Sequence, residues 1–111
     1  MFDKMKLSAD DFQIKVILAS ATKPVVVDFW AEWCGPCLAM APTYEAVASE
    51  YSDRVSFYKL NVDEEPASAQ QFNVMSIPTL IFFKNGQPTS QLVGVVQKRE
   101  LVEHVLKLLN P

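Results

Sequence analysis

Residues 25–37 decide the fold, because VVVDFWAEWCGPC places an apolar run directly before a pair of cysteines. The run VVVDFW is rich in β-branched and aromatic residues and does not alternate with polar ones, which is typical of a central strand covered on both faces. A proline in the first turn of a helix already has the required φ, so Pro36 indicates that a helix begins near Cys34. The stretch predicts a buried strand that runs into a helix, with Cys34 and Cys37 at the junction and Asp28 inside the strand.

Helical spacing appears in three further parts of the chain. Residues 8–22 open with Ser8 and Asp11, which resemble a capping box, and Pro24 ends the segment. Its apolar positions that fall on one helical face, and that we expect to be buried, are Ile14, Ile17, Leu18 and Ala21. In the helix after the cysteines, Met40, Tyr44, Val47, Ala48 and Tyr51 recur at helical spacing, and a kink is expected at Pro42. The first three of these residues are expected in the core. Residues 97–109 form an amphipathic last helix, whose apolar side is Leu101, Val102, Val105, Leu108 and Leu109.

The remaining segments predict three strands and a short helix. VSFYKLNV (55–62) alternates as a strand, and EEPASAQQF (64–72) is a short helix with Pro66 in its first turn. TLIFFK (79–84) and SQLVGVV (90–96) flank Asn85-Gly86, a strong hairpin signal. A strand–helix–strand unit requires a parallel crossover and a hairpin adds antiparallel neighbours, so we expect an α/β fold with a central mixed sheet of four to five strands and about four helices on its two faces.

Composition limits the classes of function. The chain has 111 residues, of which 50% are hydrophobic and 21% charged, and this suits one domain spanning 1–111. The net charge is −3 without any basic run, which argues against nucleic-acid binding through phosphates. No apolar run is long enough to cross a membrane, and the polar N-terminus does not resemble a secretory signal. We therefore expect a cytoplasmic location, where most thiols are kept reduced.

The cysteine pair predicts redox chemistry. At the start of a helix, Cys34 lies beside free backbone N–H groups and the positive end of the helix dipole, and both stabilise a thiolate. The thiolate is the attacking species, so Cys34 is the expected nucleophile. Cys37 lies one turn further on, within reach of a disulfide but more buried, and would resolve the mixed disulfide that Cys34 forms.

Two other interpretations of the pair remain open at this point. A structural zinc site usually needs four ligands, and the chain offers no second cysteine pair and a single histidine, His104, far away in the last helix. We therefore expect no metal. Inert buried cysteines are the second alternative.

With these motifs assembled, the sequence resembles the thioredoxin family. WCGPC at 33–37 matches the family's active-site motif, and the blocks VVVDFWAEWCGPC, MAPTYEAVASEY, FYKLNVDEEP, IPTLIFFKNGQ and LVGVVQKREL follow in the family's order and spacing over nearly the whole chain. The resemblance implies the thioredoxin fold and a thiol–disulfide oxidoreductase that reduces protein disulfides in cell redox homeostasis and electron transport. It also implies a redox-active Cys34–Cys37 disulfide, no bound cofactor, and recharging by a thioredoxin reductase with electrons from NADPH.

The resemblance assigns roles beyond the cysteines. Asp28 matches the buried aspartate behind the pair, and Lys59 matches its basic neighbour. An ionised carboxylate buried without a partner is disfavoured, so the pKa of Asp28 should rise and allow it to accept the proton of Cys37, with Lys59 tuning the exchange. The alternatives are a satisfied structural carboxylate and a solvated lysine. On its alternating strand, however, Lys59 shares a face with Val55 and Phe57, which indicates partial burial.

Six positions are expected to bind the target. Gly35 and Pro36 form the tight turn between the cysteines and match the reducing members of the family, and Trp33 matches its surface indole. The resemblance makes the Ile77–Pro78 bond cis, against the ordinary trans alternative, so that the Ile77 backbone can pair with an extended target peptide. Gly94 matches a glycine of the substrate groove, and we expect Trp33, Pro78 and Gly94 to form an apolar patch around Cys34.

Several features concern partners rather than chemistry. Leu38 stands where many members have lysine or arginine, and Asn73 and Ser76 stand where glycine is common, so partner preference is open. DEEP at 63–66 is interpreted as a solvated loop and helix start. We expect a monomer that acts on disulfide-containing client proteins. The rival hypotheses are a binding or chaperone-like module with non-essential cysteines and an oxidising or isomerising relative.

Overall fold

The computed structural model describes residues 4–110, so positions 1–3 and 111 of the predicted domain lie outside the described residues. The strands are β1 (Val25–Trp30), β2 (Ser56–Asn61), β3 (Thr79–Lys84) and β4 (Gln87–Val93). The α-helices are α1 (Ala9–Phe12), α2 (Gly35–Tyr51), α3 (Pro66–Gln71) and α4 (Lys98–Leu109). This order confirms the predicted succession of helices and strands.

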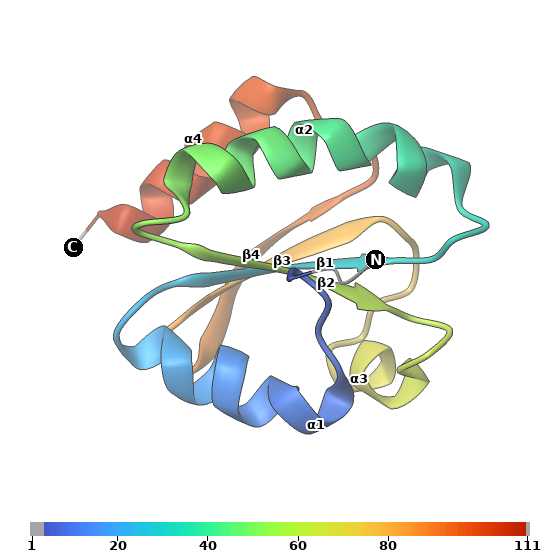
Figure 1. Ribbon diagram of the computed structural model, residues 1–111, viewed down its shortest axis with the longest axis horizontal. Helices are drawn as coiled ribbons and strands as arrows, with labels where there is room; N and C mark the ends of the chain where they lie inside the picture. Colours follow the sequence, from blue (N-terminus) through green and yellow to red (C-terminus); the bar gives the residue numbers. More distant parts are fainter. Residues whose placement is uncertain (1–3, 111) are drawn as a thin grey trace.

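The strands form one mixed sheet in the order β2-β1-β3-β4. β1 pairs in parallel with β2 and antiparallel with β3, and β3 pairs antiparallel with β4. Helices α2 and α4 cover one face of the sheet, and α1 and α3 cover the other (Figure 1). β1 therefore lies in the interior with helices above and below it, which explains its apolar sequence and the burial of every β1 residue except Trp30.

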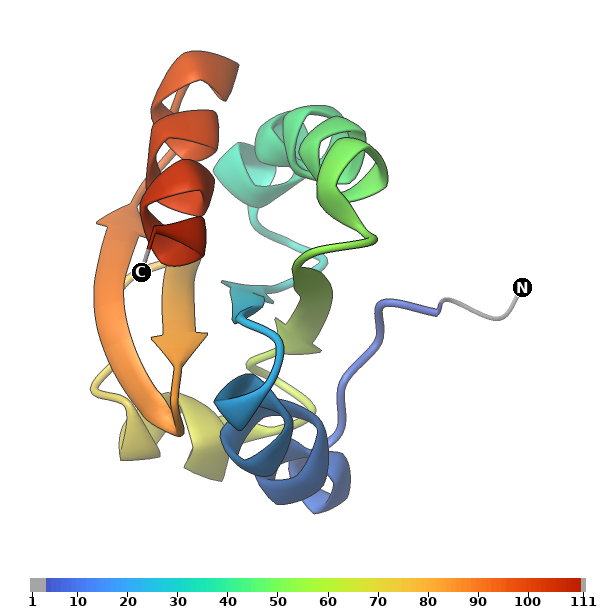
Figure 2. The same ribbon diagram turned by 90° about the vertical axis from the view of Figure 1, so that its left-hand side faces the viewer.

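The alternation of β1 side chains divides the core into two layers. Val26 packs with residues of α2 and α4, whereas Val25, Val27 and Phe29 pack with residues of the α1 and α3 side. Asp28 shares the face of Val26, because residues two apart on a strand point the same way. Its carboxyl group is therefore directed to the side of α2, the helix that begins at the cysteines. Figures 1 and 2 show α2 lying over this face of the sheet.

The first helix differs from the prediction. After α1 the chain continues as a π-helix, η1 (Gln13–Leu18), and a short 3-10 helix, η2 (Ala19–Ala21). A π-helical turn holds more residues than an α-helical turn, so the 3.6-residue spacing no longer marks the buried face. Of the four expected positions, Ile14 and Leu18 are 66% and 59% exposed, Ala21 is exposed and Ile17 is half-buried. Phe12 and Val16 are buried instead.

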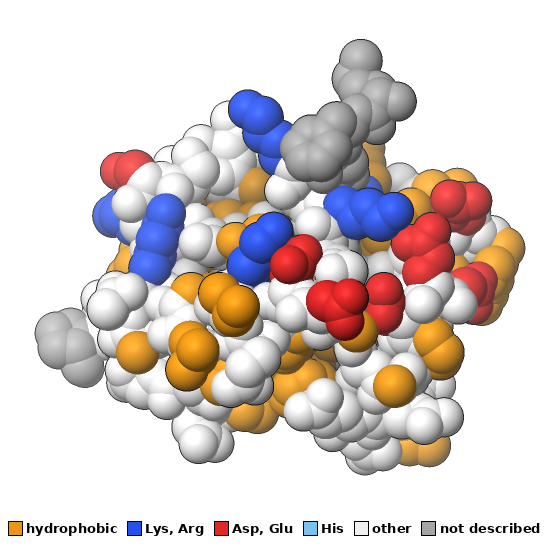
Figure 3. Space-filling view, turned by 60° about the horizontal axis from the view of Figure 1, so that its bottom comes forward, with side chains coloured by type: hydrophobic (Ala, Val, Ile, Leu, Met, Phe, Trp, Pro, Cys, Tyr) orange, Lys and Arg blue, Asp and Glu red, His pale blue; other side chains and the backbone are white. Residues whose placement is uncertain are grey.

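The predicted capping box is also wrong. The Ser8 hydroxyl donates to the Asp11 carboxylate at 3.1 Å and accepts no hydrogen bond from a backbone N–H of the helix. The exposed apolar side chains of η1 belong to the helical layer of α1 and α3. Figure 3 views the molecule from that side and shows apolar side chains among charged ones.

The two ends of the sheet show how local chemistry sets the strand limits. β4 begins at Gln87, three residues before the expected strand 90–96, because Asn85 and Gly86 alone make the turn, with φ of 55° and 78°. Of the four to five strands expected, four form, and the start of the chain adds only a bridge to β2, with Leu7 N–H donating to the Lys59 carbonyl and Lys59 N–H to the Met5 carbonyl. Within residues 4–110, no helix is long and apolar enough to cross a bilayer.

Candidate active site

Cys34 and Cys37 are joined by a disulfide at the point where α2 begins. Cys34 is the N-cap residue of this 17-residue helix, and the backbone N–H of Cys37 donates to the Cys34 Sγ at 3.2 Å. An N–H group aimed at the sulfur and the positive end of the helix dipole both stabilise negative charge there. After reduction, Cys34 is therefore the cysteine that the fold favours as a thiolate.

The two cysteines differ in access rather than in exposed fraction. Both residues are 3% exposed, so the expectation that Cys37 is more buried is wrong by this measure. However, Cys34 lines a cavity of about 590 Å³, and Cys37 does not belong to the lining of that cavity. A target disulfide that enters the cavity therefore reaches Cys34 first.

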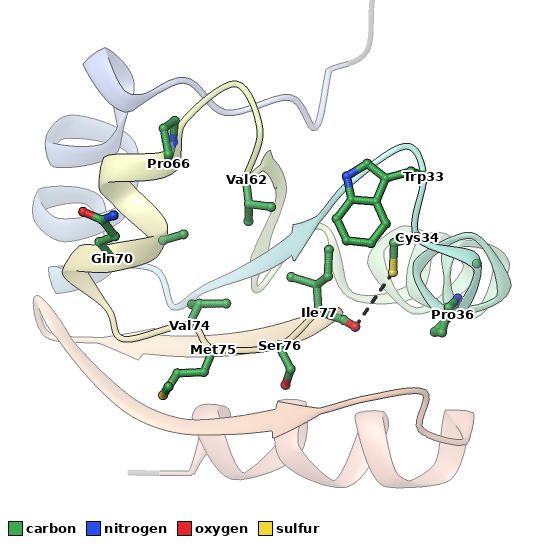
Figure 4. Close-up of a pocket in the computed structure, with 12 residues that line it drawn as sticks. Trp33, Cys34, Pro36, Val62, Pro66, Gln70, Val74, Met75, Ser76 and Ile77 are labelled. Atoms are coloured by element: carbon green, nitrogen blue, oxygen red, sulfur yellow. Dashed lines mark hydrogen bonds between the residues drawn. The ribbon is translucent and has the colours of Figure 1, made fainter.

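The cavity is built by two stretches of chain that are distant in sequence, residues 33–36 and residues 62–77 (Figure 4). Its lining consists of Trp33, Cys34, Gly35, Pro36, Val62, Pro66, Ala69, Gln70, Val74, Met75, Ser76 and Ile77. Trp33 is 70% exposed, which confirms the expected surface indole. Most lining side chains are apolar, so the cavity favours an apolar segment of a target beside the disulfide.

The Ile77 carbonyl faces the redox centre. Its oxygen lies 3.8 Å from the Cys34 Sγ, as the dashed line in Figure 4 shows. A disulfide sulfur carries no hydrogen, so in this oxidised form the pair is a contact, and a Cys34 thiol would be placed to donate. The peptide bond between Ile77 and Pro78 is cis, which confirms what the resemblance implies.

Pro78 and Gly94 lie differently from the expected patch. Neither residue lines the cavity, Pro78 is buried, and the Gly94 N–H donates to the Pro78 carbonyl at 2.8 Å. The apolar surface around Cys34 comes instead from Trp33 and from the loop that ends at Ile77. Target binding by Pro78 and Gly94 stays a prediction.

Asp28 is a buried carboxyl group without a full set of partners. The residue is 1% exposed, and its Oδ1 atom has no hydrogen-bond partner. Burial raises the pKa of Asp28 to about 7, and the positive charge of Lys59 opposes this rise. A carboxyl group with a pKa near neutral can both take up and release a proton under ordinary conditions.

Lys59 is held beside this carboxyl group by the sheet register. Asp28 and Lys59 are direct partners in the parallel pairing of β1 and β2. The Lys59 side chain is 12% exposed, its Nζ lies 4.5 Å from the centre of the Trp30 ring, and it lies 3.9 Å from Glu45 Oε2. The partial burial expected for Lys59 is confirmed, whereas its tuning of Asp28 in catalysis stays a prediction.

No other ligand set surrounds the cysteines. Among residues 4–110, no group of three or more histidine, cysteine, aspartate or glutamate side chains is arranged to hold a metal ion. His104, the single histidine, is half-buried on α4 with its ring 5.4 Å from that of Phe82.

Comparisons with known proteins agree with this geometry. The thioredoxin family model matches residues 3–107. The chain belongs to the thioredoxin family. It is a thiol–disulfide oxidoreductase with disulfide reductase chemistry, and its redox centre is the Cys34–Cys37 pair.

Individual thioredoxins support the same assignment. The chain is 48% identical over 106 residues to thioredoxin from Alicyclobacillus acidocaldarius, covering 96% of this chain and 98% of that protein. It is 45% identical over 102 residues to the chloroplastic M-type thioredoxin of Spinacia oleracea, covering 92% of this chain and 56% of that protein. It is 43% identical over 99 residues to thioredoxin of Mycobacterium tuberculosis, covering 89% of this chain and 85% of that protein. The chain thus spans about half of the spinach thioredoxin and nearly all of the Alicyclobacillus thioredoxin.

The departures from the common thioredoxin pattern lie at the surface near the redox centre. Leu38 is 53% exposed one residue after Cys37. Asn73 adopts a φ of 56°, the left-handed conformation that glycine takes most easily and that asparagine tolerates. Ser76 lines the cavity, and its carbonyl accepts from the Thr79 hydroxyl at 2.6 Å.

Sequence reasoning missed one contact at the cavity. The Trp33 indole N–H donates to the Asp63 Oδ2 at 2.7 Å, although residues 63–66 were expected to be only a solvated loop. The two residues are 30 positions apart, so no local pattern could have paired them. The bond fixes the exposed Trp33 ring over the cavity and gives Asp63 a part in positioning it.

We expect Asp63→Ala to weaken target binding more than turnover. Without the acceptor, the Trp33 ring loses its fixed orientation, so KM for insulin should rise about threefold while kcat changes little. Asp63→Asn is the matched control, because its amide oxygen still accepts a hydrogen bond. Steady-state insulin reduction measures KM and kcat for both variants. An equal rise of KM in the two variants would mean that the charge of Asp63, and not the bond to Trp33, matters.

Proposed function

We propose that this thioredoxin reduces disulfides of client proteins in the cytoplasm and is recharged by a thioredoxin reductase that draws on NADPH. The observation that carries the proposal is the position of the Cys34 Sγ. This sulfur accepts a hydrogen bond from the Cys37 N–H of α2, and Cys34 lines an apolar cavity. A nucleophilic sulfur and a surface for a protein segment thus meet at one place. This combination suits disulfides of proteins better than disulfides of small molecules.

The reaction proceeds by two exchanges at sulfur. The Cys34 thiolate attacks one sulfur of the target disulfide, a Cys34–target disulfide forms, and the other target sulfur leaves as a thiolate that takes up a proton. Cys37 then loses its thiol proton to Asp28 and attacks Cys34. The Cys34–Cys37 disulfide forms, the target sulfur leaves as a thiolate that takes up a proton, and two electrons have passed to the target.

The loop before β3 supports a mode of target docking. The Ile77 carbonyl, beside the Cys34 Sγ, offers an acceptor to the backbone of an extended target segment, as in strand addition. Trp33 and the apolar lining would contact side chains next to the target cysteine. Gly35 and Pro36 line the same cavity and would face the target at the disulfide.

The rival functions differ from this one in measurable ways. A binding or chaperone-like module would not need an N–H donor on Cys34, and its activity would survive loss of the cysteines. An oxidising relative would hold its disulfide at a higher potential. Gly35-Pro36 between the cysteines and the absence of a histidine there favour the reducing direction.

A coupled assay tests the proposal. NADPH, a bacterial thioredoxin reductase and insulin are mixed with the chain, and NADPH oxidation is followed. We expect NADPH consumption that depends on both the chain and the thioredoxin reductase. Consumption should be much slower when glutathione and glutathione reductase replace the thioredoxin reductase. Equal rates with the two recharging systems would overturn the choice of reductase, and absence of insulin reduction even with dithiothreitol would overturn the reductase function. Subcellular fractionation tests the cytoplasmic location, which chloroplast-type relatives make worth checking.

A further inference from the structure

Tyr44 lies in the interior of the molecule, where α2 packs on the neighbouring strands β1 and β2. Its side chain is completely buried, and it projects from α2 toward the sheet. The hydroxyl donates to the Tyr58 carbonyl at 2.6 Å and lies 3.2 Å from the Val26 carbonyl. A phenol has one hydrogen, so the shorter bond dominates and the second carbonyl shares it.

The two acceptors belong to the strands that carry the proton-handling residues. Tyr58 directly precedes Lys59 on β2, and Val26 lies two residues before Asp28 on β1. Tyr44 itself is seven residues after Cys37, which places both on the same face of α2 two turns apart. One hydroxyl group thus connects the helix of Cys37 to the strand of Asp28 and to the strand of Lys59.

We propose that Tyr44 is a positioning residue for the second exchange, which sets the place of Cys37 on α2 relative to Asp28. The inference rests on the proposed function, because it concerns the step in which Asp28 takes the Cys37 proton. That step transfers one proton from sulfur to carboxylate before the Cys34–Cys37 bond forms and the Cys34–target bond breaks. A proton transfer depends steeply on the separation of donor and acceptor, so the seating of α2 on the sheet affects this step directly.

The Tyr44 hydroxyl also leaves the Asp28 carboxyl group without an added hydrogen bond. Because its hydrogen is directed to backbone carbonyls, Tyr44 does not satisfy the Asp28 Oδ1, which has no partner. Burial, and next the negative charge of Asp28, raise the pKa of Tyr44 well above its ordinary value, so the phenol stays protonated and keeps donating. The charged group opposite Asp28 in the sheet is Lys59 from β2, whose Nζ lies 3.9 Å from the Glu45 Oε2 of α2, while β3 offers the uncharged Leu80.

Tyr44→Phe tests the inference, because it keeps the ring and removes only the hydroxyl. We expect the second exchange to slow about fivefold as α2 loses its link to the strands. The pH midpoint of that exchange should fall by about half a unit, because water can enter beside Asp28 at the vacated position. Alkylation of Cys34, which measures the first step, should be unchanged. A mixed disulfide trapped at low pH, where Cys37 keeps its proton, and released by a pH jump in the stopped flow measures the second step alone through Trp fluorescence.

Two control variants separate positioning from stability. Tyr51→Phe removes a phenol from the same helix, and Ser20→Ala removes a buried hydroxyl that bonds Ile17 and Gly86 at the far end of the sheet. Both should leave the second exchange and its midpoint unchanged. If Tyr44→Phe behaves like these controls, or slows both exchanges equally, the inference is wrong.

A measurement without turnover keeps the inference separate from the proposed function. The pH titration of the Asp28 carboxyl group, followed by carbon NMR, should move to lower pH in Tyr44→Phe and stay in place in Tyr51→Phe. If the wild-type protein reduces insulin but the Asp28 titration does not move in Tyr44→Phe, the inference alone is overturned. A wild-type protein that does not reduce insulin would overturn the proposed function, whatever the titration shows.

Discussion

Asp28→Asn should raise the free energy of unfolding by about 4 kcal/mol at pH 8 and by less than about 1 kcal/mol at pH 4. The cause is the raised pKa of Asp28, about 7 in the folded protein against an ordinary value of 3.8. A difference of about three pKa units corresponds to about 4 kcal/mol when the group is fully ionised. The amide is neutral at every pH and avoids this cost.

The direction of the pH dependence follows from which state binds the proton more tightly. Between pH 4 and 7 the folded protein holds the Asp28 proton, whereas the unfolded chain releases it. Folding therefore takes up a proton in this window, and stability falls as the pH rises. Above about pH 7 both states are ionised, and the difference between variant and wild type becomes constant.

Urea unfolding of both proteins at pH 4, 6 and 8 measures the effect, and only the difference between them is interpreted, because other carboxyl groups contribute equally to each. Asp53→Asn is the matched control, since its side chain is 79% exposed and should give no difference at any pH. A difference for Asp28→Asn that is equal at pH 4 and pH 8 would contradict ionisation of a buried carboxyl group as its cause.

The same substitution should impair the reaction. Asparagine cannot accept the Cys37 proton, so the second exchange should slow near neutral pH although the protein is more stable. A buried acid that lowers stability and speeds exchange illustrates why active sites keep residues that the fold alone would reject. The two effects of Asp28→Asn have opposite signs, which a structural carboxylate with satisfied hydrogen bonds would not give.

The sequence predicted the parts of this molecule that depend on local chemistry. The apolar run of β1, the Pro36 helix start and the Asn85-Gly86 turn each specify their element through a few neighbouring residues, and all three are confirmed. The buried position of Asp28 also followed from its strand. These signals are reliable because the cause lies within a few residues of the effect.

The errors arose where the cause lies elsewhere in the fold. The π-helical segment changes which residues of 13–18 are buried, and no composition signal announces it. Asp63 meets Trp33 only after α3 and the β1–α2 junction come together, and the hydroxyl of Tyr44 finds its acceptors on two strands. The polar contacts that support the site were therefore invisible in the sequence, although its reacting sulfurs were plain.

Cys37→Ser and Cys34→Ser should fail in different ways, although each should reduce insulin about a thousandfold more slowly or worse. Equal burial does not distinguish the two sulfurs, so the assignment of roles rests on the Cys37 N–H that points at Cys34 and on the cavity that Cys34 lines. With Cys34 intact, Cys37→Ser still performs the first exchange but has no thiol to release the target. It should accumulate a stable mixed disulfide.

Cys34→Ser should form no such adduct at a comparable rate, because Cys37 lacks both the N-cap position and access to the cavity. An aromatic disulfide probe, followed by mass spectrometry of the intact protein, measures adduct formation in the two variants side by side. Adducts on Cys34→Ser but not on Cys37→Ser would reverse the roles of the two sulfurs. Insulin reduction at the wild-type rate in both variants would support the rival binding module, because the N–H donor and the cavity would then serve a surface whose sulfurs do no chemistry.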